Sequence, residues 1–283
     1  MQSNTPILIA QDLSAVGTLS MKVAIPILSS FGIRISLLPT TLLSTQTEGF
    51  QQPVKQDLSP WIEQTFDHWQ QEHIHFSGGL IGYLGNTQLV DQLVSFINHD
   101  ALPSPIFDPV MGDHGKLYPG LTNDYPQAMN SLLSRASITV PNITEAQLLT
   151  GITVSDYPTK NEKRKLLTTL TNKMPTGGHA IITGVAVGER LGCIWLENDK
   201  LHFYGHPSLS GHFYGSGDVF AALLTGFLLQ QESLGTAIQH ATDGTFLALQ
   251  TTNRSPLERR FGVDLSKLLI QISKYAQTGT WDI

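Results

Sequence analysis

The chain has little of several features that mark other classes of protein. It contains one cysteine, Cys193, so it cannot form an internal disulfide, and the apolar neighbours of this residue predict a buried structural thiol. Only 14% of the 283 residues are charged and the net charge is -6, which argues against a nucleic-acid-binding surface. No apolar run reaches the length of a membrane span, so we expect no membrane partner.

Other signals of localisation and modularity are also missing. The chain does not begin with a basic segment followed by an apolar one, so we expect no secretory leader and a cytoplasmic protein. It shows no internal repeat, low-complexity tract or charged linker. Because 41% of the residues are hydrophobic, the chain can bury a sizeable core. We therefore predict a single domain over residues 1–283.

Short apolar runs alternate with segments of helical periodicity along the whole chain. The predicted strands cover 6–10, 33–38, 73–80, 104–111, 137–140 and 179–184. The predicted helices cover 19–28, 58–71, 86–98, 144–149, 160–172, 219–229, 236–249 and 264–275. Residues 192–197 and 200–205, joined by Asn198-Asp199, predict a hairpin. This order predicts an α/β fold, with a mainly parallel sheet covered on both faces and an antiparallel edge.

One stretch, Gly215-Ser216-Gly217-Asp218, stands directly before an almost wholly apolar helix. Free backbone N–H groups and the helix dipole make such a place attractive to a phosphate group. An acid there is unusual for an anion site, and it fits a base that takes a proton from a hydroxyl attacking a bound phosphoryl group. The alternative is a glycine turn with Asp218 as a helix cap.

Polar residues follow the first two predicted strands. Asp12 and Ser14 come after the first strand, where ligands bind in open α/β sheets, although both could simply cap a loop. The hydroxyl-rich run 44–47, which includes Thr47, is either a pocket edge or a polar loop. Tyr83, after a later strand, is placed to stack on an aromatic ligand.

Two acids flank a Pro-Val-Met-Gly turn. Asp108 and Asp113 could hold Mg²⁺ together with water and phosphate oxygens, since Mg²⁺ needs only one or two carboxylates. The alternative is a polar turn, but an acid such as Asp108 inside an apolar strand needs a partner. His73 and His75 share a face of a predicted strand, yet no third ligand is evident, so we interpret them as structural.

Two further segments carry polar residues after a strand. Asn142 and Glu145 flank the start of a helix, where either capping or ligand binding would suit them. Thr183-Gly184 follows a buried strand at another carboxyl end. In the predicted helix 58–71, the residues Trp61, Ile62 and Phe66 are interpreted as core contacts.

Four of these segments together resemble the pyridoxal kinase family of the ribokinase-like superfamily. They occur in this order at wide spacing: residues 108–113 (Asp-Pro-Val-Met-Gly-Asp), residues 141–146 (Pro-Asn-Ile-Thr-Glu-Ala), residues 182–184 (Ile-Thr-Gly) and residues 215–218. Each motif alone is unspecific, whereas the ordered set is strong and extends over nearly the whole chain. The resemblance implies a three-layer α/β/α sandwich and ATP-dependent phosphorylation of the 5′-hydroxymethyl group of a B6 vitamer.

The resemblance also implies a role for each site residue. Asp218 is the general base, and the backbone of Gly215, Ser216 and Gly217 forms the anion hole. The ATP-binding residues are Asp108, Asn142, Glu145, Thr183, Gly184 and Gly215. The Mg²⁺ that accompanies ATP is held near Asp108, Asp113 and Glu145, with a monovalent cation such as K⁺ close to the phosphates. Asp12, Thr47 and Tyr83 line the pyridine ring, and the family suggests a homodimer.

Several positions depart from the family pattern. Ser216 stands where threonine is commoner, Asp12 where many members have serine, and Gln46 where they have histidine. The last two differences leave the preferred vitamer open among pyridoxal, pyridoxamine and pyridoxine. A hydroxymethylpyrimidine kinase of the same fold is one alternative, but such enzymes commonly have cysteine where this chain has Asp218. A vitamer-binding protein without turnover is another alternative, although a binder needs no base.

Overall fold

The computed structural model describes residues 5–99, 102–155 and 157–283. Its centre is a nine-stranded sheet in the order β11-β10-β9-β8-β5-β4-β1-β2-β3, accompanied by a two-stranded hairpin, β6-β7. The strands of the sheet are β1 (Ile7–Ser14), β2 (Ile35–Leu43), β3 (Lys55–Asp57), β4 (Gly79–Ile81), β5 (Ile106–Phe107), β8 (Ile138–Thr139), β9 (His179–Val187), β10 (Arg190–Glu197) and β11 (Lys200–Pro207). The hairpin strands are β6 (Gly112–Asp113) and β7 (Lys116–Leu117).

Six neighbouring strands of the sheet run parallel, from β9 through β8, β5, β4 and β1 to β2. Antiparallel strands close both edges, with β10 and β11 at one and β3 at the other. In the turn between β10 and β11, Asn198 and Asp199 have φ of 49° and 58°. Positive φ at both central residues is what a type I′ hairpin turn requires, and the predicted hairpin is confirmed.

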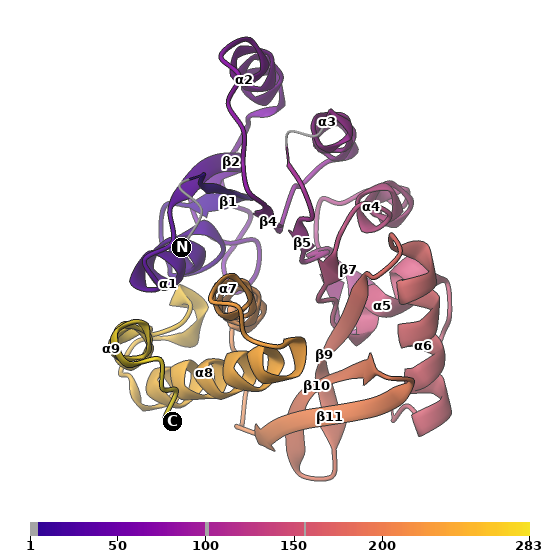
Figure 1. The fold of residues 1–283 in the computed structure, drawn as a ribbon, viewed down its shortest axis with the longest axis vertical. Coiled ribbons are helices and arrows are strands. Elements are labelled where there is room, and N and C mark those ends of the chain that lie inside the picture. Colours follow the sequence, from indigo (N-terminus) through magenta and orange to yellow (C-terminus); the bar gives the residue numbers. More distant parts are fainter. Residues whose placement is uncertain (1–4, 100–101, 156) are drawn as a thin grey trace.

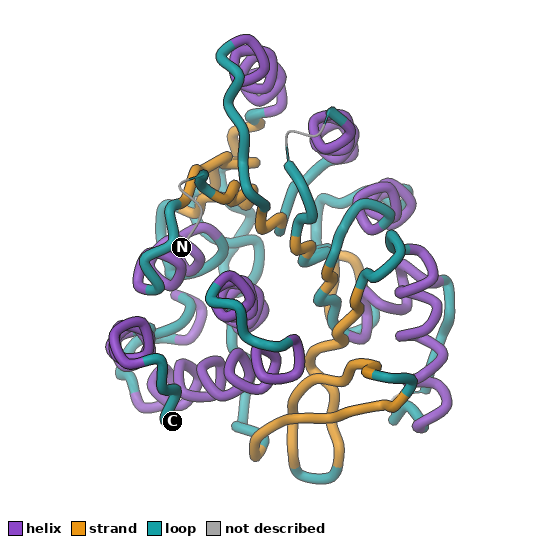
Figure 2. Tube along the Cα trace, viewed as in Figure 1, coloured by secondary structure: helices purple, strands orange, loops and turns teal. Residues whose placement is uncertain are grey.

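Helices cover both faces of the sheet, as Figures 1 and 2 show. One layer contains α1 (Met21–Ser30), α7 (Ser216–Leu229), α8 (Leu234–Arg254) and α9 (Ser266–Thr278). The other contains α2 (Ser59–Gln71), α3 (Thr87–Asn98), α4 (Tyr125–Leu133), α5 (Ile143–Thr150) and α6 (Lys160–Lys173). A short 3₁₀ helix, η1 (Arg259–Phe261), precedes α9. The predicted α/β/α sandwich is therefore confirmed.

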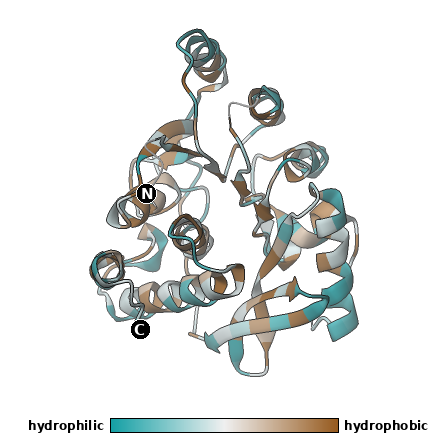
Figure 3. Cartoon of the chain, in the orientation of Figure 1, coloured by the Kyte–Doolittle hydropathy of each residue, from teal (hydrophilic) through white to brown (hydrophobic). Residues whose placement is uncertain are grey.

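Two hydrophobic cores lie on the two faces of the sheet. Helix α7 is the centre of one of them, because residues 219–227 are all buried, whereas α6 has its buried side chains only at Leu166, Leu167 and Leu170. Figure 3 shows the same contrast, with α7 mostly brown and the outside of α6 teal. Phe31 packs edge-on against Phe227 at 5.0 Å between ring centroids and joins α1 to α7.

The predicted helices are confirmed, while several strand boundaries are wrong. β1 continues to Ser14, so Asp12 lies inside the strand and not in the following loop. A register shift between Gln11 and Leu13 accompanies this extension, and the Ser14 hydroxyl gives the buried Asp12 carboxylate a hydrogen bond at 3.2 Å. β5 is shorter than predicted, and Asp108 comes directly after it.

The predicted strand 73–80 is also wrong, since only Gly79–Ile81 form β4. His73 and His75 are exposed, and His73 has a φ of 52°, which a strand residue does not adopt. Trp61 was predicted to contact the core but is 48% exposed, while Ile62 and Phe66 are buried as predicted. Cys193 is buried and its thiol lies 3.3 Å from the Thr242 hydroxyl, as expected for a structural thiol. Within the described residues, no helix is both long and apolar enough to cross a bilayer.

Candidate active site

A cavity of about 520 Å³ opens at the carboxyl ends of the parallel strands. The residues that were assigned a role in the site line it: Asp12, Thr47, Tyr83, Asp108, Asp113, Asn142, Glu145, Thr183, Gly184, Gly215, Ser216, Gly217 and Asp218. Ser14, the other candidate after the first strand, does not line the cavity and instead donates to Asp12. The role of each lining residue stays a prediction.

The parallel sheet explains this convergence. Thr47 follows β2, Tyr83 follows β4, and Asp108 follows β5. Asn142 follows β8, and Asp12 lies near the end of β1. Because the carboxyl ends of parallel strands meet at one edge of a sheet, residues far apart in sequence reach the same space there.

The N-terminus of α7 faces this cavity. Gly215, the residue before the helix, has a φ of 88°, a left-handed conformation that suits glycine. No side chain caps this helix terminus, and Gly215, Ser216 and Gly217 line the cavity. The first backbone N–H groups of a helix have no partner within the helix, so this terminus can bind an anion.

The Asp218 carboxylate lies in the first turn of α7. Its Oδ2 accepts a hydrogen bond of 2.8 Å from the backbone N–H of Ser20. Burial raises the pKa of Asp218 to about 7, opposed by that hydrogen bond and assisted by the negative charge of Asp12. A carboxyl group with a pKa close to neutrality can accept a proton at physiological pH and also release it.

Asp108 and Glu145 form the acidic floor of the cavity. Burial, followed by the charges of Glu145 and Asp218, holds the pKa of Asp108 well above its ordinary range. Burial also raises the pKa of Glu145 to about 8, although backbone N–H groups of Asn142 and Met111 donate to this carboxylate at 2.9 and 3.0 Å. The ionised carboxylates of Asp108, Glu145 and Asp218 therefore repel one another, and binding of a cation or a proton relieves this repulsion.

Asn142 and Glu145 also form a capping box at the start of α5. The Asn142 side chain accepts a hydrogen bond of 2.9 Å from the Glu145 backbone, and Glu145 accepts one in return. The Asn142 side chain also donates to the carbonyl oxygen of Gly112 at 2.8 Å. The capping interpretation is therefore confirmed, and these bonds fix the Glu145 carboxylate and the β6-β7 hairpin relative to each other.

The residues present fit a magnesium ion. Magnesium prefers hard oxygen ligands and usually takes one or two carboxylates together with phosphate oxygens and water. Asp108 is only 5% exposed, and its carboxylate has no hydrogen-bond partner among the described residues. An isolated buried carboxylate is unfavourable, and a cation would compensate it.

A second part of the cavity surrounds Asp12 and Tyr83. Asp12 is nearly fully buried, and burial raises its pKa. Burial and the nearby charge of Asp12 raise the pKa of Tyr83 to about 12, so the phenol stays neutral and can donate a hydrogen bond. Gln46, which also lines the cavity, donates to the carbonyl oxygen of Arg260 at 2.6 Å. This end offers both polar groups and an aromatic ring to a small ligand.

The aromatic end of the cavity was not predicted from the sequence. His206 on β11 stacks on Phe246 of α8, with ring centroids 4.4 Å apart and an angle of 7° between the planes. Asp243 lies 2.7 Å from His206 Nε2 and accepts a hydrogen bond of 2.8 Å from the Tyr204 hydroxyl. In each of these pairs the two residues are about 40 positions apart in sequence, so no local motif could have revealed this arrangement.

Glu48, His114 and His212 are among the other polar residues at the cavity that were missed. Each stands within three positions of a residue that was predicted: Glu48 follows Thr47, His114 follows Asp113, and His212 precedes Gly215. This adjacency is a signal that sequence analysis could have used.

Comparison with known proteins gives a consistent result. A family profile described as phosphomethylpyrimidine kinase matches residues 30–262. The crystal structure of pyridoxal kinase from Lactobacillus plantarum is 36% identical, with a TM-score of 0.92, and the match covers 97% of this chain and 99% of that one. A Bacteroides thetaiotaomicron protein, crystallised in an orthorhombic form with pyridoxal, is 29% identical with a TM-score of 0.87 and 95% coverage of both chains.

The matches to curated proteins are shorter. A hydroxymethylpyrimidine/phosphomethylpyrimidine kinase from Haemophilus influenzae is 31% identical over 58% of this chain and 61% of its own length. Matches to relatives from Saccharomyces cerevisiae and Arabidopsis thaliana span 63% and 49% of those proteins. The chain thus spans about half to two thirds of the length of these curated relatives.

Proposed function

Because this chain belongs to the phosphomethylpyrimidine kinase family of the ribokinase-like superfamily, with pyridoxal kinases among its relatives, we propose that it phosphorylates a B6 vitamer with ATP. The single observation that carries this proposal is the position of Asp218. It is an acid in the first turn of an uncapped helix, beside a glycine loop, with a pKa raised to about 7. A base next to an anion site suits transfer of a phosphoryl group to an alcohol.

In the proposed reaction, Asp218 accepts the proton of the vitamer's 5′-hydroxyl group. The oxygen of that group forms a bond to the γ-phosphorus of ATP, and the bond between this phosphorus and the β,γ-bridging oxygen breaks to leave ADP. The N–H groups at residues 215–217 hold the negative oxygens, and such preorganised donors are a major source of catalysis in water-excluded sites. Magnesium, when bound, would neutralise phosphate charge, with Asp108 and Glu145 as the residues to hold it and Asp113 nearby.

The two ends of the cavity suit two substrates. We propose that the vitamer binds near Asp12, Thr47 and Tyr83, and that the nucleotide base binds between β9, β11 and α8. The parallel rings of His206 and Phe246 offer a flat surface at the second end. Thr183 and Gly184 line the cavity from β9, which lies between β11 and β8 in the sheet, and this position supports their predicted contact with the nucleotide. Use of K⁺, assembly as a homodimer and a cytoplasmic location also stay predictions.

A hydroxymethylpyrimidine or phosphomethylpyrimidine kinase is the second candidate, because the matching family is described as phosphomethylpyrimidine kinase and the Haemophilus influenzae relative is named for both activities. Turnover of Mg·ATP with pyridoxal, pyridoxine, pyridoxamine and hydroxymethylpyrimidine separates the candidates. We expect the largest kcat/KM for one of the B6 vitamers. A larger kcat/KM for hydroxymethylpyrimidine would contradict the proposal, and ligand binding without ADP formation would indicate a binding protein.

A further inference from the structure

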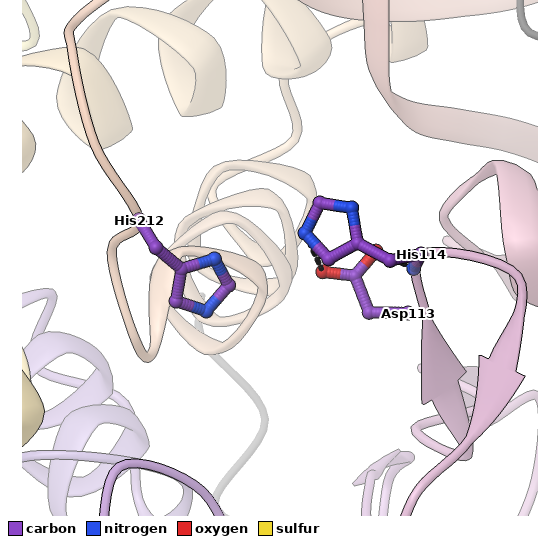
Figure 4. Close-up of side chains that lie close together, drawn as sticks. All are labelled: Asp113, His114 and His212. Atoms are coloured by element: carbon purple, nitrogen blue, oxygen red, sulfur yellow. Dashed lines mark hydrogen bonds and ion pairs between the residues drawn. The ribbon is translucent and has the colours of Figure 1, made fainter.

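Asp113, His114 and His212 gather at the mouth of the cavity. Each offers one ligand atom, and these atoms all lie within 4.8 Å of one another. Figure 4 shows two of them on the β6-β7 hairpin and the third on the loop before α7, with the histidine rings turned toward the same space. The pair His114 and His212 has its ring centroids 6.0 Å apart. The fold thus joins two segments separated by 98 positions (212 − 114).

Both segments are fixed by contacts outside the cluster. On the hairpin, the backbone N–H of Gly115 donates to the Thr144 hydroxyl at 2.9 Å. On the loop, Arg259 donates to the carbonyl oxygen of Ser210 at 2.7 Å and lies over the Phe213 ring at 4.1 Å. These contacts hold the chain on each side of His212, so its backbone stays near the hairpin that carries His114.

The donor atoms define the class of metal that the cluster would take. One oxygen of Asp113 accepts a hydrogen bond from the His114 backbone at 2.7 Å, and its Oδ2 lies 3.5 Å from His114 Nε2. Two imidazole nitrogens and one carboxylate oxygen suit zinc and neighbouring transition metals, whereas magnesium prefers oxygen ligands alone. Zinc ligands at about 2.0–2.2 Å from the metal lie roughly 3.4 Å apart, which these exposed side chains reach by rotation.

We propose that Asp113, His114 and His212 form a site for a divalent transition metal such as Zn²⁺, separate from the magnesium position near Asp108 and Glu145. Three protein ligands leave coordination positions open for water or for an oxygen of the substrate. A bound ion would tie the hairpin to the loop before α7, across the entrance of the cavity. Glu48 lines the same entrance, close enough for its carboxyl group to interact electrostatically with Asp113, His114 and His212.

Cobalt is a spectroscopic substitute for zinc in such sites, so Co²⁺ titration of the metal-stripped full-length protein tests the proposal. The visible absorption of Co²⁺ is followed in excess Mg²⁺ and without nucleotide. We expect one Co²⁺ per chain, displaced by Zn²⁺ and not by Mg²⁺. His114→Gln and His212→Gln should each weaken Co²⁺ binding at least about ten-fold, the lower limit found even for lost supporting partners of metal ligands.

Two matched variants complete the test. His75→Gln removes an exposed histidine far from the cavity and should leave Co²⁺ affinity unchanged. Asp108→Asn removes the buried acid of the proposed magnesium position and should keep Co²⁺ bound. The proposal is overturned if both histidine variants bind Co²⁺ like the parent, or if only Asp108→Asn abolishes binding.

Hydrogen exchange supplies an independent readout of the link across the entrance. Zn²⁺ should slow backbone exchange in both residues 112–117 and residues 208–215 of the parent, and in neither segment of His212→Gln. Equal exchange with and without Zn²⁺ would overturn the proposed link. Since no measurement here uses kinase turnover, failure of this site is distinguishable from failure of the proposed kinase function.

Discussion

At the scale of single residues, the site is a set of carboxyl groups that the fold holds in an unfavourable state. The pKa values of Asp12, Asp108, Glu145 and Asp218 are all raised, in each case with burial as the main cause. When folding raises the pKa of a carboxyl group, the group's contribution to the free energy of unfolding depends on pH. The stabilising contribution is fully present at a pH below the pKa of the unfolded state. It is lost as the pH rises through the pKa of the folded state. The unliganded site therefore opposes folding most at neutral and alkaline pH.

Because the ionised Asp108 carboxyl is unfavourable in the folded protein, we predict that Asp108→Asn stabilises the unliganded protein. The amide carries no charge, so it avoids both the desolvation of the carboxylate and its repulsion by Glu145 and Asp218. We expect a higher Tm than the parent at pH 8 and a difference that shrinks as pH falls toward 4, where the folded carboxyl is protonated and the unfolded one begins to be. Thermal melts without metal or nucleotide measure this.

Asp91→Asn is the matched control, because Asp91 is exposed on α3. Its Tm should follow that of the parent across the same pH range. If Asp108→Asn were no more stable than the parent at pH 8, the Asp108 carboxyl would not be held in an unfavourable state.

The acids of the site could be predicted from sequence because each stands in a short local motif. Asp108, Glu145 and Asp218 belong to segments whose glycines, prolines or caps indicate a turn at the end of a strand or the start of a helix. His206 and Phe246 could not be predicted in this way. Their stacking depends on β11 packing against α8, and no spacing within either segment encodes that contact.

At the scale of elements, the N-terminus of α7 connects conformation to function. Gly215 has a left-handed φ of 88° directly before the free N–H groups. Gly32, after α1, has a φ of 75°, with no heavy atom within 4 Å of where a Cβ would lie. The two glycines thus share a conformation, and only Gly215 lines the cavity.

Gly215→Ala and Gly32→Ala should therefore differ in activity and agree in stability. A left-handed alanine costs about 1–2 kcal/mol, so both variants should unfold more readily by roughly this amount. Only Gly215→Ala should also lose turnover. An alanine at this position would relieve its backbone strain by changing its conformation, and this change would displace the N–H groups of the anion site. Chemical denaturation and kcat are the measurements, and an unimpaired kcat in Gly215→Ala would contradict the assigned anion site.

Helices were predicted better than strands for a physical reason. Helices α2, α3 and α6 carry a repeating apolar stripe over three turns or more, which a sequence displays clearly. Strands β5 and β8 have only two residues each. So short a segment shows no periodicity, and its pairing depends on neighbouring strands. The strand predicted over residues 73–80 was likewise too long, because it included an exposed loop before the three residues of β4.

At the scale of the whole molecule, the cavity extends along the edge of the sheet where the parallel strands end, and it has two distinct ends. Tyr83, after β4, lies at one end, and Phe246 on α8 lies at the other, with the acidic floor between them. A mainly parallel sheet and an antiparallel hairpin at its edge were predicted, and both are confirmed. The resemblance to pyridoxal kinases implied two such subsites, with Tyr83 at the pyridine ring and Thr183 at the nucleotide.

This arrangement predicts that two aromatic substitutions each weaken the binding of a different substrate. Tyr83→Ala should weaken pyridoxal binding by up to about tenfold, since an aromatic contact contributes roughly 0.5–1.5 kcal/mol. Its affinity for ATP should stay near that of the parent. Phe246→Ala should weaken ATP binding to a similar degree and spare pyridoxal. Calorimetric titration with each ligand decides this, and a reversed pattern would exchange the two subsites.

The central claim is that Asp218 is the base of a kinase, and the variant Asp218→Asn tests it most directly. The amide oxygen can still accept the hydrogen bond of 2.8 Å that the Ser20 backbone donates, but it cannot take a proton. General-base catalysis contributes about 10²–10⁴-fold, so turnover of Mg·ATP and the vitamer should fall by that factor. Dissociation constants for both substrates should change little, and the Tm should not fall, because the buried charge of Asp218 is removed.

The pH dependence of the same variant completes the measurement. In the parent, kcat/KM should fall below about pH 7, because the raised pKa of Asp218 leaves the base protonated at acid pH. The residual activity of Asp218→Asn should lack this decline. If Asp218 only held the Ser20 backbone through its hydrogen bond, the Asn variant would keep parental turnover with the parental pH profile, and that result would contradict a role as the base.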